Sequence, residues 1–191
     1  MTYLECVTTK ITMNIYTDGN VLLNKGQSKD PLAIGCFGFW CHSKTFLSNC
    51  QWEVSSTTME IKAVISALEY IITDKIYRAT IYSDSQSVVH LLNNKTKKPK
   101  SYEGIQLFDL FASINNKTNL KPKIVWVKGH FESEGNLKID QLLEEQLIRC
   151  IKKLDVNTQL KIIQKAKSNL SRGITQSFSE QFFDSLFKGN F

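Results

Sequence analysis

Short apolar runs, separated by turn residues, dominate the first half of the chain and predict β-strands. We expect strands at residues 11–17, 33–41, 46–54, 79–83 and 123–127. The first three runs follow one another closely, which is typical of an antiparallel meander. The first run stops at Asp18-Gly19, a common turn dipeptide, so we expect the first strand to end there.

Apolar residues spaced three and four apart predict helices between the later strands. In residues 57–73 this stripe consists of Val64, Ala67, Leu68 and Ile71. Further helices are expected at residues 85–93, at 102–115 and from near Leu137. A meander followed by α/β alternation predicts an α/β fold, in which helices cover both faces of a mixed sheet.

From about residue 147 the chain continues with helical patterns and shows no further strand signal. Asp155 to Thr158 is the expected break between two of these helices. The aromatic residues near the end have helical spacing, so we expect them to be buried against the core. Docking to a protein partner is the alternative, because Gln181–Phe187 loosely resembles short peptides that bind replication clamps. We therefore divide the chain into residues 1–146 and a helical basic extension, 147–191.

The charge and cysteine content narrow the function classes only slightly. The 191 residues carry a formal charge of +6, which hints at a polyanionic partner. That charge is concentrated in the extension, with 8 Lys and Arg against 3 Asp and Glu, whereas residues 1–146 hold 16 against 15. The cysteine count is odd and no C-x-x-C motif occurs, so we expect free thiols in a reducing, cytoplasmic setting. No apolar stretch is long enough to predict a membrane-spanning helix.

Four acidic residues recur where predicted elements meet. Asp18 ends the first strand, Glu60 lies in the first turn of the first helix, Asp84 ends the fourth strand and Asp140 begins a later helix. His130 follows the fifth strand. Neighbouring strand ends can bring such groups to one rim of a sheet, where their repulsion would require cations. Carboxylate oxygens are the ligands that Mg²⁺ and Mn²⁺ prefer.

Each of these residues also has a purely structural interpretation. Thr57-x-x-Glu60 is a possible capping box, and Asp84 a possible helix N-cap. Asp140 is an acid favoured by the helix dipole, and His130 is an ordinary loop histidine. The joint pattern favours a common site, because all four acids occur in the order that one site requires.

The motifs around these acids resemble the type 1 ribonuclease H family. The matching segments are YTDG at 16–19, TTMEIKAVISALE at 57–69, YSDSQSV at 82–88, VWVKGH at 125–130 and EGNLKID at 134–140. The resemblance covers roughly residues 11–150, and its last two segments are the most specific. It implies a ribonuclease H-like fold, in which a three-strand antiparallel meander and two parallel strands form a five-stranded mixed sheet. The extension, 147–191, lies beyond the match.

The resemblance also implies an activity, namely hydrolysis of the RNA strand of an RNA–DNA hybrid to leave 5′-phosphate and 3′-hydroxyl ends. The implied catalytic groups are Asp18, Glu60, Asp84 and Asp140, which would bind two Mg²⁺ ions, with Mn²⁺ as a substitute. His130 would be an auxiliary group on a loop. In such a two-metal site, one ion activates the attacking water and the other stabilises the leaving oxygen.

Substrate contacts are carried over less directly. The resemblance points to the segment after the first Asp and to the starts of two helices, namely Gly19, Asn20, Ser56, Thr57 and Gln86. Ser56 departs from the family, which usually has Asn at that position. Many cellular members insert a Trp-bearing basic helix between the fourth and fifth strands, and the stretch here is too short for it. The lysine run Lys95, Lys97, Lys98 and Lys100 is either a substitute grip or a solvated loop.

Two alternatives to a ribonuclease H remain at this stage. One is a catalytically silent module on the same fold that binds nucleic acid or protein. The other is a relative with DNA-directed chemistry, such as a transposase or a junction resolvase. The complete set of acids argues against the first and the His130–Asp140 segment against the second. Because Met1 lies close to the first predicted strand, we also expect a freestanding protein.

Overall fold

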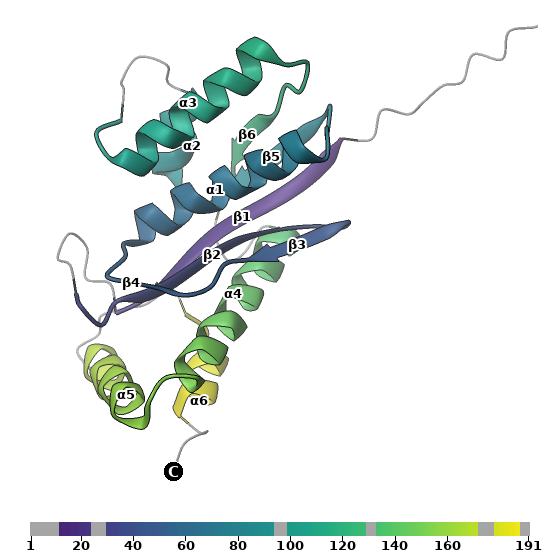
Figure 1. The fold of residues 1–191 in the computed structure, drawn as a ribbon. Coiled ribbons are helices and arrows are strands. Elements are labelled where there is room, and N and C mark those ends of the chain that lie inside the picture. The colour runs from purple at the N-terminus through teal and green to yellow at the C-terminus, as the bar shows by residue number, and fades with distance from the viewer. Residues whose placement is uncertain (1–11, 24–29, 94–98, 129–132, 172–177, 188–191) are drawn as a thin grey trace, which may run out of the picture.

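A computed structural model describes residues 12–23, 30–93, 99–128, 133–171 and 178–187. Its strands form a single mixed sheet, in the spatial order β3-β2-β1-β5-β6, and β4 pairs with β2 (Figure 1). The strands are β1 (Met13–Leu22), β2 (Ile34–Cys41), β3 (Lys44–Leu47), β4 (Gln51–Trp52), β5 (Ala79–Ser83) and β6 (Lys123–Trp126). β1 pairs antiparallel with β2 and parallel with β5, and β5 pairs parallel with β6. The predicted meander with two parallel strands is therefore confirmed.

Helices cover both faces of this sheet (Figure 1). The helices are α1 (Ser56–Thr73), α2 (Gln86–Asn93), α3 (Tyr102–Lys117), α4 (Glu134–Lys152), α5 (Val156–Ser171) and α6 (Glu180–Phe187). α1, α2 and α3 share one apolar core with β1, β5 and β6, and the stripe predicted for α1 is fully buried there. α4, α5 and α6 share a second core with β1 and β2. Among the described residues, no helix combines the length and the apolar composition that crossing a membrane requires.

The first strand is longer than the sequence predicted. We expected it to end at Asp18-Gly19, but β1 runs on to Leu22, and Asp18 pairs with Gly38 of β2. The turn interpretation was wrong because Val21 and Leu22 are apolar and buried, so the meander pairing extends past the glycine. Asp18 consequently lies in the interior of a central strand.

Two further element boundaries differ. The predicted strand at 46–54 is divided into β3 and β4, which both pair with β2. The helix expected from near Leu137 begins at Glu134, because the Ser133 side chain accepts a hydrogen bond from the backbone N–H of Asn136 and caps it there. Asp140 therefore lies in the second turn of α4 and does not begin the helix.

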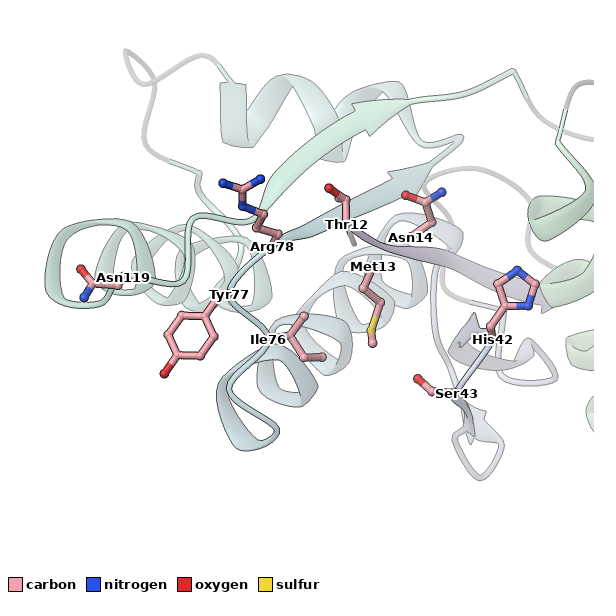
Figure 2. Close-up of a pocket in the computed structure, with 9 residues that line it drawn as sticks. All are labelled: Thr12, Met13, Asn14, His42, Ser43, Ile76, Tyr77, Arg78 and Asn119. Carbon is pink, nitrogen blue, oxygen red and sulfur yellow. The ribbon is translucent and has the colours of Figure 1, made fainter. Parts of the chain in front are cut away.

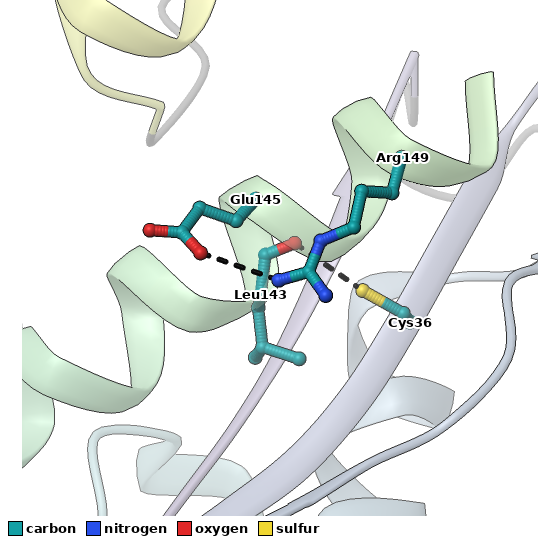
Figure 3. Close-up of polar contacts among 4 residues, drawn as sticks. All are labelled: Cys36, Leu143, Glu145 and Arg149. Carbon is teal, nitrogen blue, oxygen red and sulfur yellow. Dashed lines mark hydrogen bonds and ion pairs between the residues drawn. The ribbon is translucent and has the colours of Figure 1, made fainter. Parts of the chain in front are cut away.

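The start of α4 is held close to β1 by a glycine. A Cβ atom on Gly135 would lie 2.3 Å from ring carbons of Tyr16, so only glycine permits this approach. Further along, the Cys36 thiol of β2 donates to the carbonyl of Leu143 at 3.5 Å, and Arg149 pairs with Glu145 on the outer face of α4 (Figure 3). Burial, with a smaller effect of the Asp18 charge, raises the pKa of Cys36 to about 12. This thiol therefore stays protonated as part of the core.

The C-terminal helices are packed into the fold as predicted. Ile162, Ile163 and Ala166 of α5 and Phe182 of α6 are almost fully buried in the second core. α6 is also fixed by a polar contact, since the buried Glu144 accepts hydrogen bonds from the backbone N–H and the hydroxyl of Ser179. The break between α4 and α5 lies at residues 153–155. Of the predicted range, 155–158, only Asp155 belongs to the break, and the next three residues begin α5. Burial of these aromatic residues favours packing over the clamp-peptide alternative.

One cysteine pair contradicts the expectation of free thiols. Cys50, in the loop after β3, and Cys150, near the end of α4, form a disulfide across 100 residues of sequence. Spacing along the chain cannot reveal such a pair, because only the packing of α4 on the sheet brings the two residues together. Cys36 and Cys41 are free and buried, as expected, and Cys6 lies outside the described residues.

Candidate active site

Three of the predicted carboxylates come together in the structure. Asp18 of β1, Glu60 of α1 and Asp84, which follows β5, each place one carboxylate oxygen within 4.8 Å of the others. Asp18 is buried, whereas Glu60 and Asp84 are half-buried. The cluster thus combines residues from three elements that are far apart in the sequence.

The position of Glu60 depends on a glycine in β1. A Cβ atom on Gly19 would lie 2.4 Å from the Met59 carbonyl carbon and 2.5 Å from the Glu60 nitrogen. No larger residue would allow α1 to cross β1 this closely. Gly19, predicted as a substrate contact, therefore packs against the backbone of α1 beside the carboxylates.

The predicted capping box at Thr57–Glu60 is not the cap of α1. The helix begins at Ser56, and the side chain of Ser55 caps it by accepting a hydrogen bond from the Thr58 N–H. The box was misplaced because Ser55 stands two residues before Thr57 and supplies the same kind of oxygen. Glu60 is left with no capping role and lies in the second turn, facing Asp18.

The residues that precede Asp18 in β1 and Asp84 in β5 contact each other beside the cluster. β1 and β5 pair in parallel with Thr17 opposite Ser83, and the Thr17 hydroxyl donates to the Tyr82 carbonyl at 3.1 Å. The rings of Tyr16 and Tyr82 stack with their centroids 4.9 Å apart. Asp84 follows directly after β5, as predicted. Because these contacts fix β5 against β1, they also fix the position of Asp84 relative to Asp18.

Asp140 lies beside the cluster but does not belong to the group of three. It is buried in α4, and its Oδ1 accepts a hydrogen bond from the side-chain amide of Asn20 at 2.9 Å. Its charge still reaches the site, since it contributes to the raised pKa of Asp18. Asn20 was predicted as a substrate contact, and its bond to Asp140 was not predicted. The alternation of Asp18 and Asn20 on one face of β1 is the signal that could have indicated it.

Burial and mutual repulsion raise the pKa values of two carboxylates. Burial is the largest effect on Asp18, followed by the charges of Asp84 and Asp140. Burial is also the largest effect on Glu60, followed by the charges of Asp18 and Asp84. The fold therefore holds acidic groups where their ionised forms are disfavoured unless a cation joins them.

The donor set suits a hard divalent cation. Carboxylate oxygens are typical Mg²⁺ ligands, and here several converge from different elements. The Oε2 atom of Glu60 is buried and finds no hydrogen-bond partner in the described part of the chain. A buried carboxylate oxygen without a partner is unfavourable, and a metal ion at the cluster would satisfy it.

The other predicted site residues divide into two groups. Ser56 and Thr57 are exposed at the start of α1, and Gln86 is exposed at the start of α2. His130, Lys95, Lys97 and Lys98 lie outside the described residues. Lys100, the last lysine of that run, is exposed.

Two polar residues near the carboxylates were not singled out from the sequence. The indole N–H of Trp126 donates to the backbone carbonyl of Asp84 at 3.0 Å, which links β6 to the site. Asn136, one helical turn before Asp140, is 1% exposed, and neither polar atom of its amide has a partner among the described residues. Asn136 belongs to the EGNLKID segment that also contains Asp140, and this was the sequence signal that could have indicated it.

A cavity of about 680 Å³ lies away from this cluster. Figure 2 shows its lining, with Met13 at the start of β1, His42 after β2, and Tyr77 and Arg78 before β5. Asp18 is four residues beyond Asn14, the last lining residue of β1, which amounts to about 13 Å along an extended strand. The cavity is therefore separate from the carboxylates.

Comparison with known proteins agrees with the geometry. The sequence model of the RNase H family matches residues 10–148. A ribonuclease H of Ruthia magnifica subsp. Calyptogena magnifica is 30% identical over 141 residues, which cover 67% of this chain and 90% of that protein. A ribonuclease H of Shewanella denitrificans is 27% identical over 163 residues, covering 80% and 98% respectively. The match spans every element that supplies a carboxylate, from β1 to α4, and the chain belongs to the RNase H family.

Proposed function

We propose that this protein is an endonuclease that hydrolyses the RNA strand of RNA–DNA hybrids and leaves 5′-phosphate and 3′-hydroxyl ends. The observation that carries the proposal is the convergence of Asp18, Glu60 and Asp84 within 4.8 Å, on the framework of the RNase H family. Relatives that match most of the chain bear the name ribonuclease H.

Asp18, Glu60 and Asp84 are the residues that would hold divalent metal, with Asp140 beside them, and we expect two Mg²⁺ ions, replaceable by Mn²⁺. Such ions supply Lewis acidity, which activates water and offsets charge on the phosphate. The chain contributes the rigidity of the site. The pairing of β1 with β5 holds Asp18 near Asp84. Gly19 lets α1 approach β1 closely enough for Glu60 to face Asp18. The Asn20 amide orients Asp140 through a hydrogen bond.

The proposed substrate contacts are the residues predicted from the sequence, and three of them are exposed near the cluster. Ser56 and Thr57 at the start of α1, and Gln86 at the start of α2, are accessible to a nucleic acid backbone. Gly19 and Asn20, also predicted as contacts, are buried in β1 beside Asp18. They would act on the substrate by shaping the place where the scissile phosphate would be bound. We assign His130 the role of an auxiliary in proton transfer or product release, and Lys95, Lys97 and Lys98 an electrostatic grip on the hybrid.

The domain division is part of the proposal. Residues 1–146 would form the catalytic domain and 147–191 a basic extension that adds contacts to nucleic acid. α4 passes through this boundary, and α5 and α6 share a core with the sheet, so the extension would act as a fixed part of the fold. A cytoplasmic location stays a prediction from the sequence, and the Cys50–Cys150 disulfide weighs against it, because disulfides are rare in that compartment.

The decisive variant is Asp84→Asn, with Asp109→Asn on the exposed surface of α3 as its matched control. We expect Asp84→Asn to lower Mg²⁺-dependent cleavage of a labelled hybrid by roughly a hundredfold or more, because a direct ligand matters at least as much as the groups that orient one. Asp109→Asn should cleave like the unchanged protein. A fully active Asp84→Asn protein would overturn the assignment.

The alternative is a catalytically silent module that only binds nucleic acid or protein. It predicts hybrid binding with no metal-dependent cleavage and no difference between the two variants. The carboxylate cluster weighs against it, because a protein without catalysis gains nothing from acids that repel one another in a partly buried site.

A further inference from the structure

A second cavity is lined by residues of α2, which begins two residues after Asp84, and by Trp126 of β6. It has a volume of about 420 Å³ and is lined by Gln86, Val89, His90, Asn93 and Trp126. This volume lies within the range of sites that enclose small ligands. The Trp126 indole donates to the backbone carbonyl of Asp84 at 3.0 Å, so one wall of the cavity is fixed to a residue of the cluster.

The wall formed by α2 is the polar, outward-facing side of an amphipathic helix. Gln86, His90 and Asn93 follow one another at intervals of four and three, which places them on one face of the helix. The opposite face, with Val88 and Leu92, is buried in the core. The outward face thus carries two amides and an imidazole, and no charged carboxylate lines the cavity among its described residues.

These side chains match the chemistry of a nucleobase edge. The amides of Gln86 and Asn93 each offer both a donor and an acceptor. Val89, which is 7% exposed, supplies an apolar surface between them. Such a set can bond to the edges of different bases, which gives binding with little sequence preference.

Trp126 supplies the remaining element of a base-binding site. It is 42% exposed although it is the largest apolar side chain on β6, and its hydrogen bond to Asp84 restrains the ring. Unpaired bases bind proteins by stacking on aromatic rings while their edges form hydrogen bonds. A base within a duplex has its edge already occupied, so it cannot enter such a cavity.

We propose that this cavity binds an unpaired nucleotide adjoining the hybrid, so that the protein favours junctions between hybrid and single strand. The inference rests on the proposed function, because it assumes that hybrid lies over the carboxylate cluster next to the cavity. Its consequence is a specificity for substrate structure, supplied by residues outside the cluster.

The test compares a blunt RNA–DNA hybrid with the same hybrid carrying a short unpaired extension at each end of each strand in turn. We expect at least one extended substrate to have a KM roughly tenfold lower than the blunt hybrid, as expected for one stacked base. The ratio of the two KM values should fall to about one in Trp126→Leu and in a His90→Ala, Asn93→Ala double variant. Trp126→Phe should retain most of the ratio because it keeps a ring. Tyr77→Leu, at another exposed aromatic residue, should keep it fully.

The ratio is the informative quantity, because a variant that disturbs Asp84 changes cleavage of blunt and extended substrates alike. The same ratio can be measured without cleavage, as Kd values from fluorescence anisotropy in chelator. Equal values for blunt and all extended hybrids would overturn the inference, as would an advantage that survives in both cavity variants. Failure to cleave the blunt hybrid would instead count against the proposed function, and the Kd ratio would still decide the inference.

Discussion

Removing one charge from the carboxylate cluster should stabilise the metal-free protein. The change is Asp84→Asn, which keeps the shape of the side chain but removes a negative charge whose field raises the pKa values of both Asp18 and Glu60. In a protein that binds metal there, these acids are placed for the ion and not for the stability of the metal-free fold. The variant should therefore separate stability from activity.

The size of the effect follows from the geometry. Two unit charges within 4.8 Å of each other repel by about 3 kcal/mol or more at an effective dielectric constant of ~20. Because Asp18 and Glu60 already reduce this repulsion by taking up protons, the relief from one removed charge should be about 1–3 kcal/mol. For a chain of this size that corresponds to a rise in Tm of roughly 3–9 °C.

The stability gained from Asp84→Asn should depend on pH in a definite direction. Asp18 and Glu60 have folded-state pKa values above their ordinary values of 3.8 and 4.5. As pH rises past those ordinary values, the unfolded chain loses protons first, so the stability of the folded protein falls until pH exceeds the folded-state pKa values. Asp84→Asn makes this fall in stability smaller, because it removes one of the charges that raise the two pKa values. Its stability advantage over the unchanged protein should therefore grow as pH rises above those ordinary values.

The assay is thermal unfolding in chelator and in Mg²⁺, with Asp109→Asn as the surface control. In chelator, Asp84→Asn should unfold at a higher temperature than the unchanged protein. Mg²⁺ at about a hundred times its Kd should stabilise the unchanged protein by about 2.7 kcal/mol and the variant by much less. If Asp84→Asn were less stable than the unchanged protein in chelator at neutral pH, the electrostatic reasoning would be refuted.

Three other contacts give predictions of the same kind. Gly19→Ala should lower the free energy of unfolding by about 1–3 kcal/mol and reduce hybrid cleavage, because its Cβ would push α1 from β1; chemical denaturation with activity assays tests this. Cys150→Ser removes the disulfide, so it should lower the free energy of unfolding by about 2–4 kcal/mol and abolish the response of Tm to reductant; differential scanning calorimetry measures both. Glu144→Ala removes both bonds from Ser179, and it should destabilise the protein by about 1–3 kcal/mol and speed proteolysis near α6; unchanged proteolysis would contradict this.

Much of the fold was predictable because its signals are local. The apolar stripe of α1 and the short apolar run of β5 each occupy consecutive residues, and both elements occur where predicted. The extent of β1 was not predictable in this way. Asp18-Gly19 has the composition of a turn, and only pairing with β2 carries the strand past it.

The site shows the same division between local and distant information. The order of the acids along the chain, together with the family motifs, indicated Asp18, Glu60 and Asp84 as neighbours, and the structure brings them together. The bond from Asn20 to Asp140 joins residues 120 positions apart and depends on how α4 lies on the sheet. The disulfide between Cys50 and Cys150 was missed for the same reason.

The most direct test of the account is cleavage of labelled substrates by the purified protein. An RNA–DNA hybrid with labelled RNA, a double-stranded RNA and a double-stranded DNA of the same sequence are each incubated with Mg²⁺, with Mn²⁺ or with chelator. We predict cleavage of the RNA strand of the hybrid alone, with either metal and not with chelator, and products that carry 5′-phosphates. Hybrid that stays intact with both metals, or cleavage of the double-stranded DNA in its place, would contradict the account.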